Sequence, residues 1–351
     1  MTPLLPSTPH DACGRLSAVT VTELTDPTAV GDMIQVVELD AVQLESRPLR
    51  ARRVTVNLDT SVLIFHSTNL ALRTRTKLPA DFVAFTVFGP CACGTMNGLS
   101  VGPDRLLACG PGVEVEFVVS AGYESVVLLL PCDELRMELR RRRREDELPL
   151  PNGVELLQSN PSAARELYGL VRYLVDQAAR QPDVFELPQT QAVAQTQILE
   201  SLLAALESTD NVEPVSQDRT RLARSRVVQV AENYALAHAA DKLSIGDLCE
   251  AAGVSERTLQ YAFKELMGMR PIAYLNRFRL HQVRRSLRAA NHASTTVTRE
   301  ALLWGFWHFG DFSRAYKDCF GELPSDTLRR PPNAHPAEVS VIGDNSILSG
   351  R

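Results

Sequence analysis

The hydrophobic pattern of this chain changes once, at Pro131, and that change constrains the fold more than any other feature of the sequence. Between residues 34 and 130 the chain consists of short β-branched or alternating runs separated by Gly, Pro and Asn turn residues. After Pro131 the apolar residues recur at three- and four-residue spacing, as at Leu167, Leu170, Val171 and Leu174. The sequence therefore predicts an α+β protein of two domains in which strands come first and helices follow.

The strand-sized runs are typical of an antiparallel β-barrel or sandwich, because they are short and regularly separated by turns. We expect strands at Val54–Leu58, Ser61–Phe65, Phe82–Phe88, Val113–Val119 and Ser125–Leu130. Three trailing helices, expected to support dimerisation, are predicted at Asp133–Arg144, Ser162–Arg180 and Pro188–Glu207.

Shifts in composition divide the chain into five parts. We expect a partly flexible N-terminal segment at 1–33, a β-rich domain with its trailing helices at 34–207, a polar linker at 208–220, an all-α domain at 221–330 and a disordered tail at 331–351.

Several classes of protein are excluded by composition. No apolar run approaches the roughly 18 residues that a membrane-spanning helix needs. The first eleven residues have neither the basic nor the apolar region of a secretory signal. Seven cysteines are an odd number and too few for a disulfide scaffold, which favours a reducing compartment. We therefore expect a cytoplasmic protein with no membrane partner.

The charge is distributed unevenly along the chain. Residues 1–220 have 19 Lys and Arg against 29 Asp and Glu, a net charge of −10. Residues 221–330 have 17 Lys and Arg against 11 Asp and Glu, a net charge of +6. Such asymmetry indicates that the helical domain meets a polyanion, although basic solvated helices are also common.

A short helix-turn-helix pattern begins the helical domain, at about 243–264. Ser244 with Asp247 fits a capping box, Gly253 fits a left-handed helix end, and Ser255 fits the cap of a second helix. On that second helix, inward positions are occupied by Leu259, Phe263 and Leu266. The opposite face has the long donor side chains that a major-groove reader needs, namely Arg257, Gln260, Tyr261 and Lys264.

The same pattern recurs at about 296–317, after a connecting helix that starts near Pro271. Here we expect Thr298 to cap the first helix, Gly305 to form the turn and Phe306 to fill the core between the two helices. The second helix is expected to bury Phe312, Tyr316 and Phe320 and to expose Gly310, Asp311, Arg314 and Lys317.

These residues carry a resemblance to a known family. The run Gly305-Phe306, Phe312-Ser313-Arg314-Ala315-Tyr316-Lys317 and Gly321-Glu322-Leu323-Pro324 resembles the AraC/XylS-type transcription regulators, with their GF, F-x-R-x-F-K and G-x-x-P elements. Phe263-Lys264 and Gly268-x-x-Pro271 are similar to the first half of the same domain. Tyr316 replaces the commoner Phe. The segment 305–310 is similar to a branch of the family whose N-terminal domain is a divergent cupin-like sensor.

The resemblance implies an effector-controlled transcription regulator that binds double-stranded DNA and RNA polymerase as a homodimer. We expect an activator, with repression as the alternative that the sequence leaves open. The base-reading residues would be Arg257, Gln260, Tyr261, Asp311 and Arg314, and the phosphate-positioning residues Ser255, Thr258, Lys264 and Lys317. Because Gly310 and Asp311 offer a gap and a negative charge, we expect the second unit to read fewer bases than the first.

Other features carry weaker signals. Cys91, Cys93, Cys109 and Cys132 are open to a metal or redox role, but small buried cysteines are commoner. His66 is the single histidine of the expected sheet, so a cupin metal site is not predicted. The run Arg140–Arg144 fits a solvated helix end better than a DNA contact. Trp304, Trp307 and Phe309 are expected mostly in the core of the second unit.

No motif for nucleophilic, phosphate-binding or metalloprotease chemistry occurs, so we expect neither an enzyme nor a cofactor. The rival hypothesis is a small-molecule enzyme or binding module that uses the helical domain as a protein-interaction surface. Specific retention of a DNA fragment distinguishes the two hypotheses.

Overall fold

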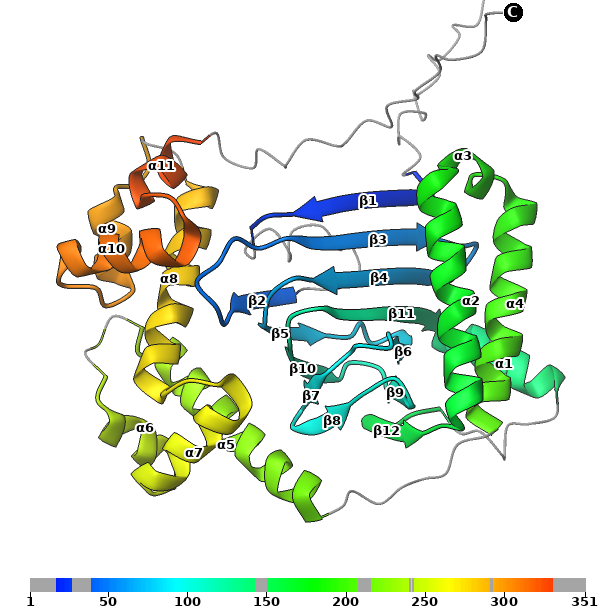
Figure 1. Ribbon diagram of the computed structural model, residues 1–351, viewed down its shortest axis with the longest axis horizontal. Coiled ribbons are helices and arrows are strands. Elements are labelled where there is room, and N and C mark those ends of the chain that lie inside the picture. The colour runs from blue at the N-terminus through cyan, green and yellow to red at the C-terminus, as the bar shows by residue number, and fades with distance from the viewer. Residues whose placement is uncertain are drawn as a thin grey trace, which may run out of the picture.

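The computed structural model describes residues 17–26, 39–142, 150–207, 216–239, 241, 243–290 and 293–330. It confirms the α+β class and the two-domain organisation, with β-structure first and a helical domain last (Figure 1). The expected tail at 331–351, residues 1–16 and most of the expected linker lie outside the described residues.

Two antiparallel sheets form the N-terminal domain. The seven-stranded sheet has the order β1 (Val19–Leu24), β3 (Ala51–Asn57), β4 (Val62–Thr68), β11 (Tyr123–Pro131), β6 (Phe82–Phe88), β9 (Arg105–Cys109) and β12 (Val154–Gln158). The five-stranded sheet has the order β2 (Leu39–Gln43), β5 (Leu72–Lys77), β10 (Glu114–Val119), β7 (Gly94–Met96) and β8 (Leu99–Val101).

The sheet begins earlier than the sequence pattern predicts. β1 pairs with β3 along its whole length, from Val19 opposite Val56 to Leu24 opposite Ala51. Because this strand is an integral edge of the seven-stranded sheet, a domain boundary at residue 34 is too late. β1 contains two threonines and is separated from the next strand by a stretch of chain. The hydrophobic periodicity of β1 therefore does not reveal that this strand pairs with β3.

Each face of the large sheet has its own core. The outer face packs against α2 (Pro161–Arg180) and α4 (Pro188–Glu207), and the inner face packs against the five-stranded sheet. Strand alternation divides the side chains, so that Val54 and Phe65 face the helices while Ala51 and Ile64 face the other sheet. Two shorter helices, α1 (Cys132–Arg141) and α3 (Pro182–Phe185), complete this layer.

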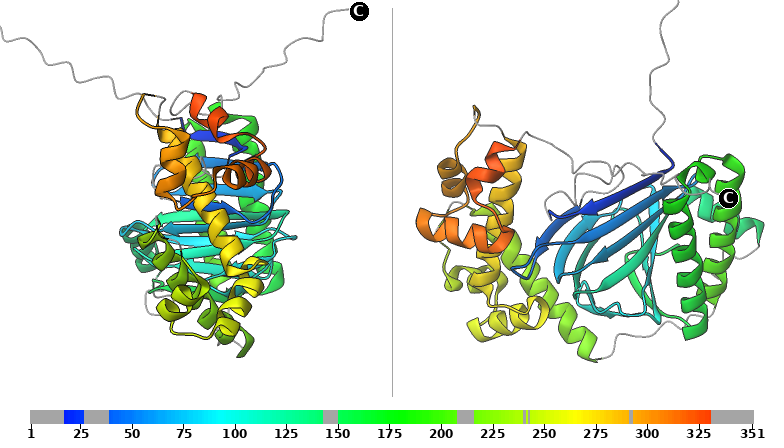
Figure 2. Two further views of the ribbon diagram at one scale, coloured as in Figure 1. Left: turned by 90° about the vertical axis from the view of Figure 1, so that its left-hand side faces the viewer. Right: turned by 45° about the horizontal axis from the view of Figure 1, so that its top comes forward.

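The helical domain lies on the opposite side of the sheets from α2 and α4 (Figures 1 and 2). It consists of α5 (Ser216–Ala237), α6 (Ile245–Ala252), α7 (Glu256–Met267), α8 (Pro271–Ala289), α9 (Val297–Leu303), α10 (Phe309–Phe320) and α11 (Pro324–Arg329). α5 starts inside the expected linker, at Ser216. Among the described helices, none has the length and apolar character needed to cross a bilayer.

The two domains share a hydrophobic core. Val42 of β2 is fully buried within the helical domain, in one cluster with Val228 of α5, Phe263 of α7 and Tyr274 of α8. The outward face of the small sheet therefore packs against the helical domain, and its inward face packs against the large sheet inside the N-terminal domain.

Candidate nucleic-acid interface

The first helix-turn-helix unit is held by three local capping interactions. Ser244 and Asp247 form a reciprocal capping box at the start of α6, and this network lowers the pKa of the Asp247 carboxyl. Gly253 ends α6 in the left-handed conformation, with φ of 63°. Ser255 then caps α7 at once by accepting a hydrogen bond from the Thr258 amide at 3.3 Å. These contacts fix α7 relative to α6.

The two faces of α7 differ sharply. Leu259 and Phe263 are fully buried against the shared core, and Leu266 is nearly so. The residues expected to contact DNA are all exposed on the other face, namely Ser255, Arg257, Thr258, Gln260, Tyr261 and Lys264.

Contacts among the exposed residues pre-arrange the reading face of α7. Arg257 donates to the Tyr261 hydroxyl at 3.3 Å and lies 5.2 Å from the centre of its ring. Gln260 donates to Glu256 at 2.8 Å. Both contacts join residues one helical turn apart and leave polar edges facing outward, because Tyr261 remains 51% exposed.

The second unit repeats this arrangement with one correction. Thr296, not Thr298, caps α9 by accepting a hydrogen bond from the Arg299 amide at 3.2 Å. Both threonines precede the first buried residues of the helix, so the pattern alone places the cap ambiguously within two residues. Gly305 forms the turn with φ of 76°, as expected.

The outer face of α10 carries the remaining expected contacts. Phe312 and Tyr316 are buried, while Gly310, Asp311, Arg314 and Lys317 are exposed. Arg314 is paired with Asp311 at 3.1 Å, and both side chains are more than 70% exposed. The carboxylate therefore lies beside the one arginine expected to read a base in this unit.

The expectation for the aromatic residues of the second unit is partly wrong. Trp304 packs against the core of this unit and donates to Ser286. Trp307 and Phe309, however, are 58% and 41% exposed. Trp307 lies just before α10 and Phe309 is its first residue, so both stand at an end of the helix that the core of this unit leaves uncovered among the described residues.

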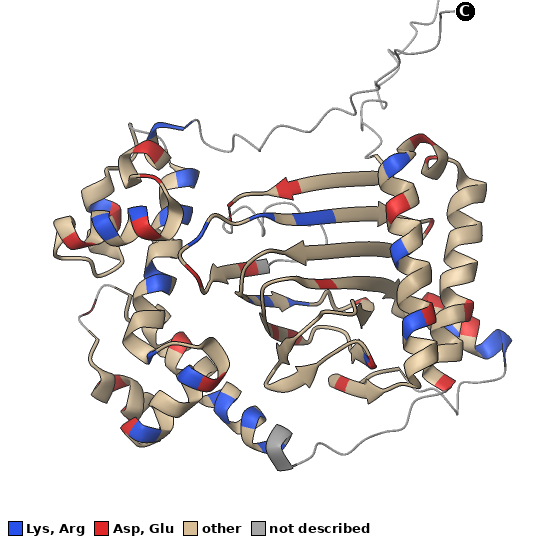
Figure 3. Ribbon diagram, in the orientation of Figure 1, with Lys and Arg blue, Asp and Glu red and all other residues tan. Residues whose placement is uncertain are grey.

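α8 joins the two units and belongs to both cores. Its first half contributes Tyr274 and Phe278 to the core of the first unit, and its second half contributes Val283 and Leu287 to the core of the second. Charged residues of both signs are distributed over the helices of this domain (Figure 3). The basic residues are therefore spread along several helices of the domain rather than gathered on one of them.

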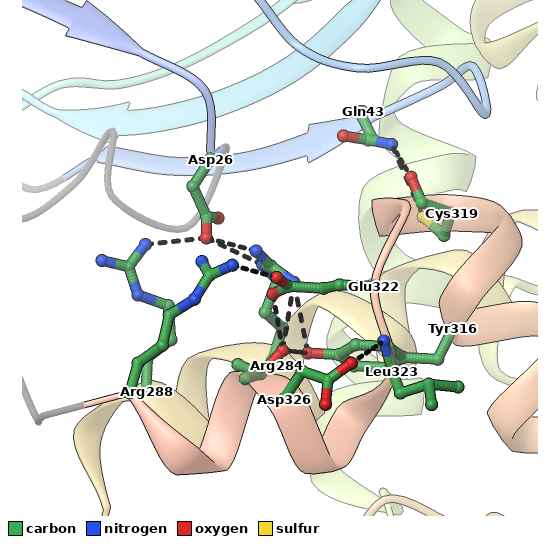
Figure 4. Close-up of polar contacts among 11 residues, drawn as sticks. Asp26, Gln43, Arg284, Arg288, Tyr316, Cys319, Glu322, Leu323 and Asp326 are labelled. Atoms are coloured by element: carbon green, nitrogen blue, oxygen red, sulfur yellow. Dashed lines mark hydrogen bonds and ion pairs between the residues drawn. The ribbon is translucent and has the colours of Figure 1, made fainter. Parts of the chain in front are cut away.

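One polar cluster ties the second unit to the N-terminal strand (Figure 4). Asp26, just after β1, accepts from Arg284 and Arg288 of α8 at 2.7 Å each. Arg284 also pairs with Glu322 at 2.8 Å and donates to the Tyr316 hydroxyl at 3.3 Å. These acids more than offset burial and raise the pKa of the Arg284 guanidinium.

β2 makes a second connection to this unit (Figure 4). The Gln43 side chain donates to the Cys319 carbonyl at 2.5 Å, and the Gln43 amide donates to His281 Nε2 at 3.3 Å. Burial lowers the pKa of His281 to about 3, so its ring is neutral and can accept. The Tyr316 hydroxyl, which the commoner Phe would lack, is satisfied by Thr327 at 2.8 Å.

A buried ion cluster ties the first unit to the small sheet. Arg73 of β5 pairs with Glu116 of β10 at 2.9 Å and with Glu232 of α5. Tyr274 of α8 donates to the other oxygen of Glu232. All four side chains are at least 93% buried. Burial raises the pKa of Glu232 to about 7, with Arg73 acting against it.

The interior of the N-terminal domain contains a cavity of about 140 Å³ between the two sheets. Most of its wall is apolar and comes from both sheets, with hydroxyl groups from several threonines. Arg53 and His66 also line it. The sequence pattern does not identify Arg53 as a cavity residue. A charged residue in an alternating strand is ordinarily expected on the solvent side, and only the folded structure shows that this one faces inward.

The remaining sequence candidates do not converge on a metal centre. Cys91 and Cys93 are exposed, while Cys109 and Cys132 are buried and burial raises the pKa of both thiols, that of Cys109 to about 12. No group of three or more His, Cys, Asp or Glu ligands forms among the described residues. Of the Arg140–Arg144 run, Arg142 pairs with acids of its own domain, and the last two residues lie outside the described ranges.

Comparison with known proteins places this geometry in a family. A family model described as a helix-turn-helix domain matches residues 248–330, from within α6 to the end of α11. The match therefore includes both units and the helix that joins them. The matched region is an AraC-type helix-turn-helix domain. The family's GF turn is Gly305-Phe306 here, and its G-x-x-P elements are the left-handed ends of α7 and α10.

Two curated AraC/XylS-type relatives extend beyond this domain. The chain is 31% identical over 216 residues to the probable thc operon regulatory protein of Rhodococcus erythropolis, covering 58% of this chain and 63% of that protein. It is 29% identical over 229 residues to the XylDLEGF operon transcriptional activator 3 of Pseudomonas putida, covering 65% and 66%. The alignments thus span slightly less than two thirds of these relatives.

Among solved structures, a probable AraC family transcriptional regulator from Rhodopseudomonas palustris is 36% identical, with a TM-score of 0.27. It covers 30% of this chain and 98% of that chain.

Gly305 offers a test of the second AraC-type unit. A Cβ atom there would lie 2.9 Å from the Ala239 carbonyl oxygen, at a φ of 76°. Gly305→Ala should lower the free energy of unfolding by at least about 1–2 kcal/mol, the cost of the left-handed conformation alone. Gly310→Ala, where a Cβ meets nothing within 4 Å inside a helix, is the control and should raise it slightly. Thermal unfolding of both variants measures this, and equal stabilities would contradict the assigned turn.

Proposed function

We propose that this protein is a sequence-specific DNA-binding transcription regulator, an activator that contacts RNA polymerase in the cytoplasm under the control of a small-molecule effector. One observation carries the proposal. Arg257, Gln260, Tyr261 and Lys264 occupy a single exposed face of α7, and α6 holds that helix at its capped end. This is the arrangement in which a recognition helix enters the major groove.

The roles of the exposed residues follow from their hydrogen-bonding groups. Arg257 and Arg314 suit guanine, Gln260 suits adenine, and Asp311 suits the cytosine amino group. Tyr261 holds the guanidinium of Arg257 and shares the reading role. We assign phosphate positioning to Ser255, Thr258, Lys264 and Lys317, which lie at the helix start or along the rim of each reading face.

Because α8 joins the first unit at one of its halves and the second unit at the other, we propose that α7 and α10 enter successive major-groove segments. The half-sites would then lie about one helical turn, roughly 10 bp, apart.

Two variants on α7 test this proposal with the full chain. Lys264→Ala should weaken binding to all fragments alike and reduce the dependence of log affinity on log salt by about one phosphate contact. Gln260→Ala should relax preference at one base position at a cost of about 1–3 kcal/mol for the preferred base. Gel-shift titrations against genomic fragments, followed by binding-site selection, measure both. No fragment retained specifically at physiological salt would favour an enzyme or protein-binding module instead.

The two units are expected to read DNA unequally. Asp311 neutralises Arg314 at 3.1 Å and brings a negative charge toward phosphate, whereas α7 presents donors. Asp311→Ala should therefore keep or raise overall affinity and change preference at no more than one position, while Arg257→Ala should abolish specific binding. Site selection on both variants provides the measurement. Half-sites of equal information content would contradict the asymmetry.

We propose further that an effector in the cavity acts through β5 and β10. Alternation places Thr74 and Val115 of these strands at the cavity and places Arg73 and Glu116 at the helical domain. A ligand that shifts either strand would therefore also move the Glu232 carboxylate, which Arg73 binds. The Tyr274 hydroxyl, which donates to that carboxylate, would move with it. The first DNA-binding unit is attached at that point.

Removing Arg73 tests this connection. Arg73→Met would leave Glu116 and Glu232 buried without their common cation, at a cost of roughly 3–5 kcal/mol. The domains should then unfold in two separate thermal transitions instead of one. Arg75→Met is the matched control, because its partners Glu114 and Asn233 are more exposed and such pairs contribute only about 0–1 kcal/mol. One unchanged transition in Arg73→Met would refute the coupling.

We also propose that the protein is a homodimer joined through the trailing helices. Tyr173 of α2 and Val193 of α4 are 59% and 58% exposed on the side facing away from the sheet. Apolar side chains of this size on neighbouring helices suit a symmetric helix-to-helix contact.

A further inference from the structure

Two aromatic side chains are uncovered at the start of α10. Trp307 is 58% exposed and Phe309 is 41% exposed. Phe306 and Phe312, on either side of them in the chain, turn inward instead and pack with ring centres 5.0 Å apart in the core of the second unit. This internal contact fixes the short segment between them. The two exposed rings are therefore held at a defined place, and grouped apolar side chains of this kind mark a contact surface.

The aromatic pair lies at the end of α10 that is remote from the N-terminal domain. At the other end of the helix, Gln43 of β2 donates to the Cys319 carbonyl at 2.5 Å. With a rise of about 1.5 Å per residue, Phe309 lies roughly 15 Å along the helix from that contact. Figure 1 shows α9 and α10 at the outer edge of the molecule. The described part of the N-terminal domain therefore leaves the pair open to a partner.

The position of the pair on α10 is the one from which a recognition helix reads bases. Such a helix presents its N-terminal residues to the base edges of the major groove. Phe309 is the first residue of α10, and Trp307 precedes it by two positions. Further along the helix, Arg314 and Lys317 are exposed for DNA contact. At Gly310, between them, a Cβ atom would meet nothing within 4 Å, so the space beside the rings is open.

The chemistry of the two rings restricts what they can read. Major-groove base edges are polar, except that thymine presents its C5-methyl group, which apolar side chains contact. We propose that Trp307 and Phe309 select thymine in the second half-site by packing against this methyl group. The inference rests on the proposed DNA-binding function. It adds an apolar base preference to the unit in which Asp311 already occupies Arg314, at 3.1 Å.

A protein partner is the other occupant that exposed aromatic rings suit. The centre of a protein–protein interface is depleted in charged residues. Here the exposed neighbours on α10 include Asp311, Arg314 and Lys317, all of them charged. Basic side chains beside an apolar contact suit DNA, because phosphates flank the base edges along both strands. The charges around the pair therefore favour DNA over a protein surface.

Removing the methyl group from the DNA tests the contact directly. Binding-site selection first identifies the half-site whose preference Gln260→Ala leaves unchanged, which is the half-site under α10. Each thymine there is then replaced by deoxyuridine, which lacks the methyl group and keeps every hydrogen-bonding group. At one or two positions the full-length protein should bind about fourfold more weakly, the cost of losing one buried methyl group. Selection without a thymine preference, or an affinity that no deoxyuridine changes, would overturn the proposal.

Protein variants locate the contact on the aromatic pair. When Trp307→Ala and Phe309→Ala are combined, the thymine and deoxyuridine fragments should bind equally. Trp307→Phe keeps an apolar ring and should keep part of the difference. Leu303→Ala is the matched control and should retain the full fourfold effect, because Leu303 is 51% exposed in the same unit but belongs to α9.

The outcomes separate this inference from the proposed function. Melting temperatures check folding, and Trp307→Ala alone decides if the double variant is unfolded, since Trp307 lies outside the helices. Specific DNA binding with an unchanged deoxyuridine effect in the folded variants would overturn the inference and leave the regulator intact. The pair would then be a surface for a protein partner. Specific retention of no fragment would overturn the proposed function and this inference with it.

Discussion

The alternation of side chains along two strands of the small sheet is the constraint on which the rest of the molecule depends. On β5 and β10, inward residues form one wall of the cavity and outward residues meet the helical domain. Successive residues of a strand face opposite sides, so a one-residue shift in register would exchange the two sets. Arg73 would then enter the cavity and leave Glu232 without its cation. The register of β5 and β10 therefore determines both the lining of the cavity and the contact between the two domains.

The helical domain depends in the same way on α8. A single helix supplies apolar residues to both units, so the spacing between the two reading faces follows from its length rather than from a flexible joint. Buried Arg284 of α8 binds the second unit through Glu322, whereas Tyr274 near the start of α8 packs in the first unit and donates to Glu232. The two recognition helices, α7 and α10, are thereby held at a fixed distance from each other.

The sequence predicts the local features of this structure well. The capping box at Ser244, the left-handed Gly253 and the start of α8 at Pro271 depend on neighbours within a few residues, so each is visible in a short window. The exposed face of α7 follows from helical spacing in the same way. The resemblance to the AraC/XylS pattern also predicts the second helix-turn-helix unit. It does not fix the exact N-cap of α9, which is Thr296 and not the expected Thr298.

Features that join distant segments could not be predicted. β1 finds its partner across a long stretch of chain, and Trp307 is exposed because nothing packs over the start of α10 among the described residues. Arg53 is an unremarkable strand residue in sequence and becomes distinctive only once both sheets enclose it. Burial of a charge is a property of the assembled fold, and neither propensity nor periodicity records it.

The contact between Asp26 and Arg284 spans 258 positions of the chain. During synthesis, the segment after β1 leaves the ribosome well before its partner on α8 does. Domains form in order from the amino terminus, so the sheet can close before this contact exists. The second DNA-binding unit therefore settles onto a surface that is already made. Its docking is expected to be a late step in folding, and a chain terminated before α8 would lack it entirely.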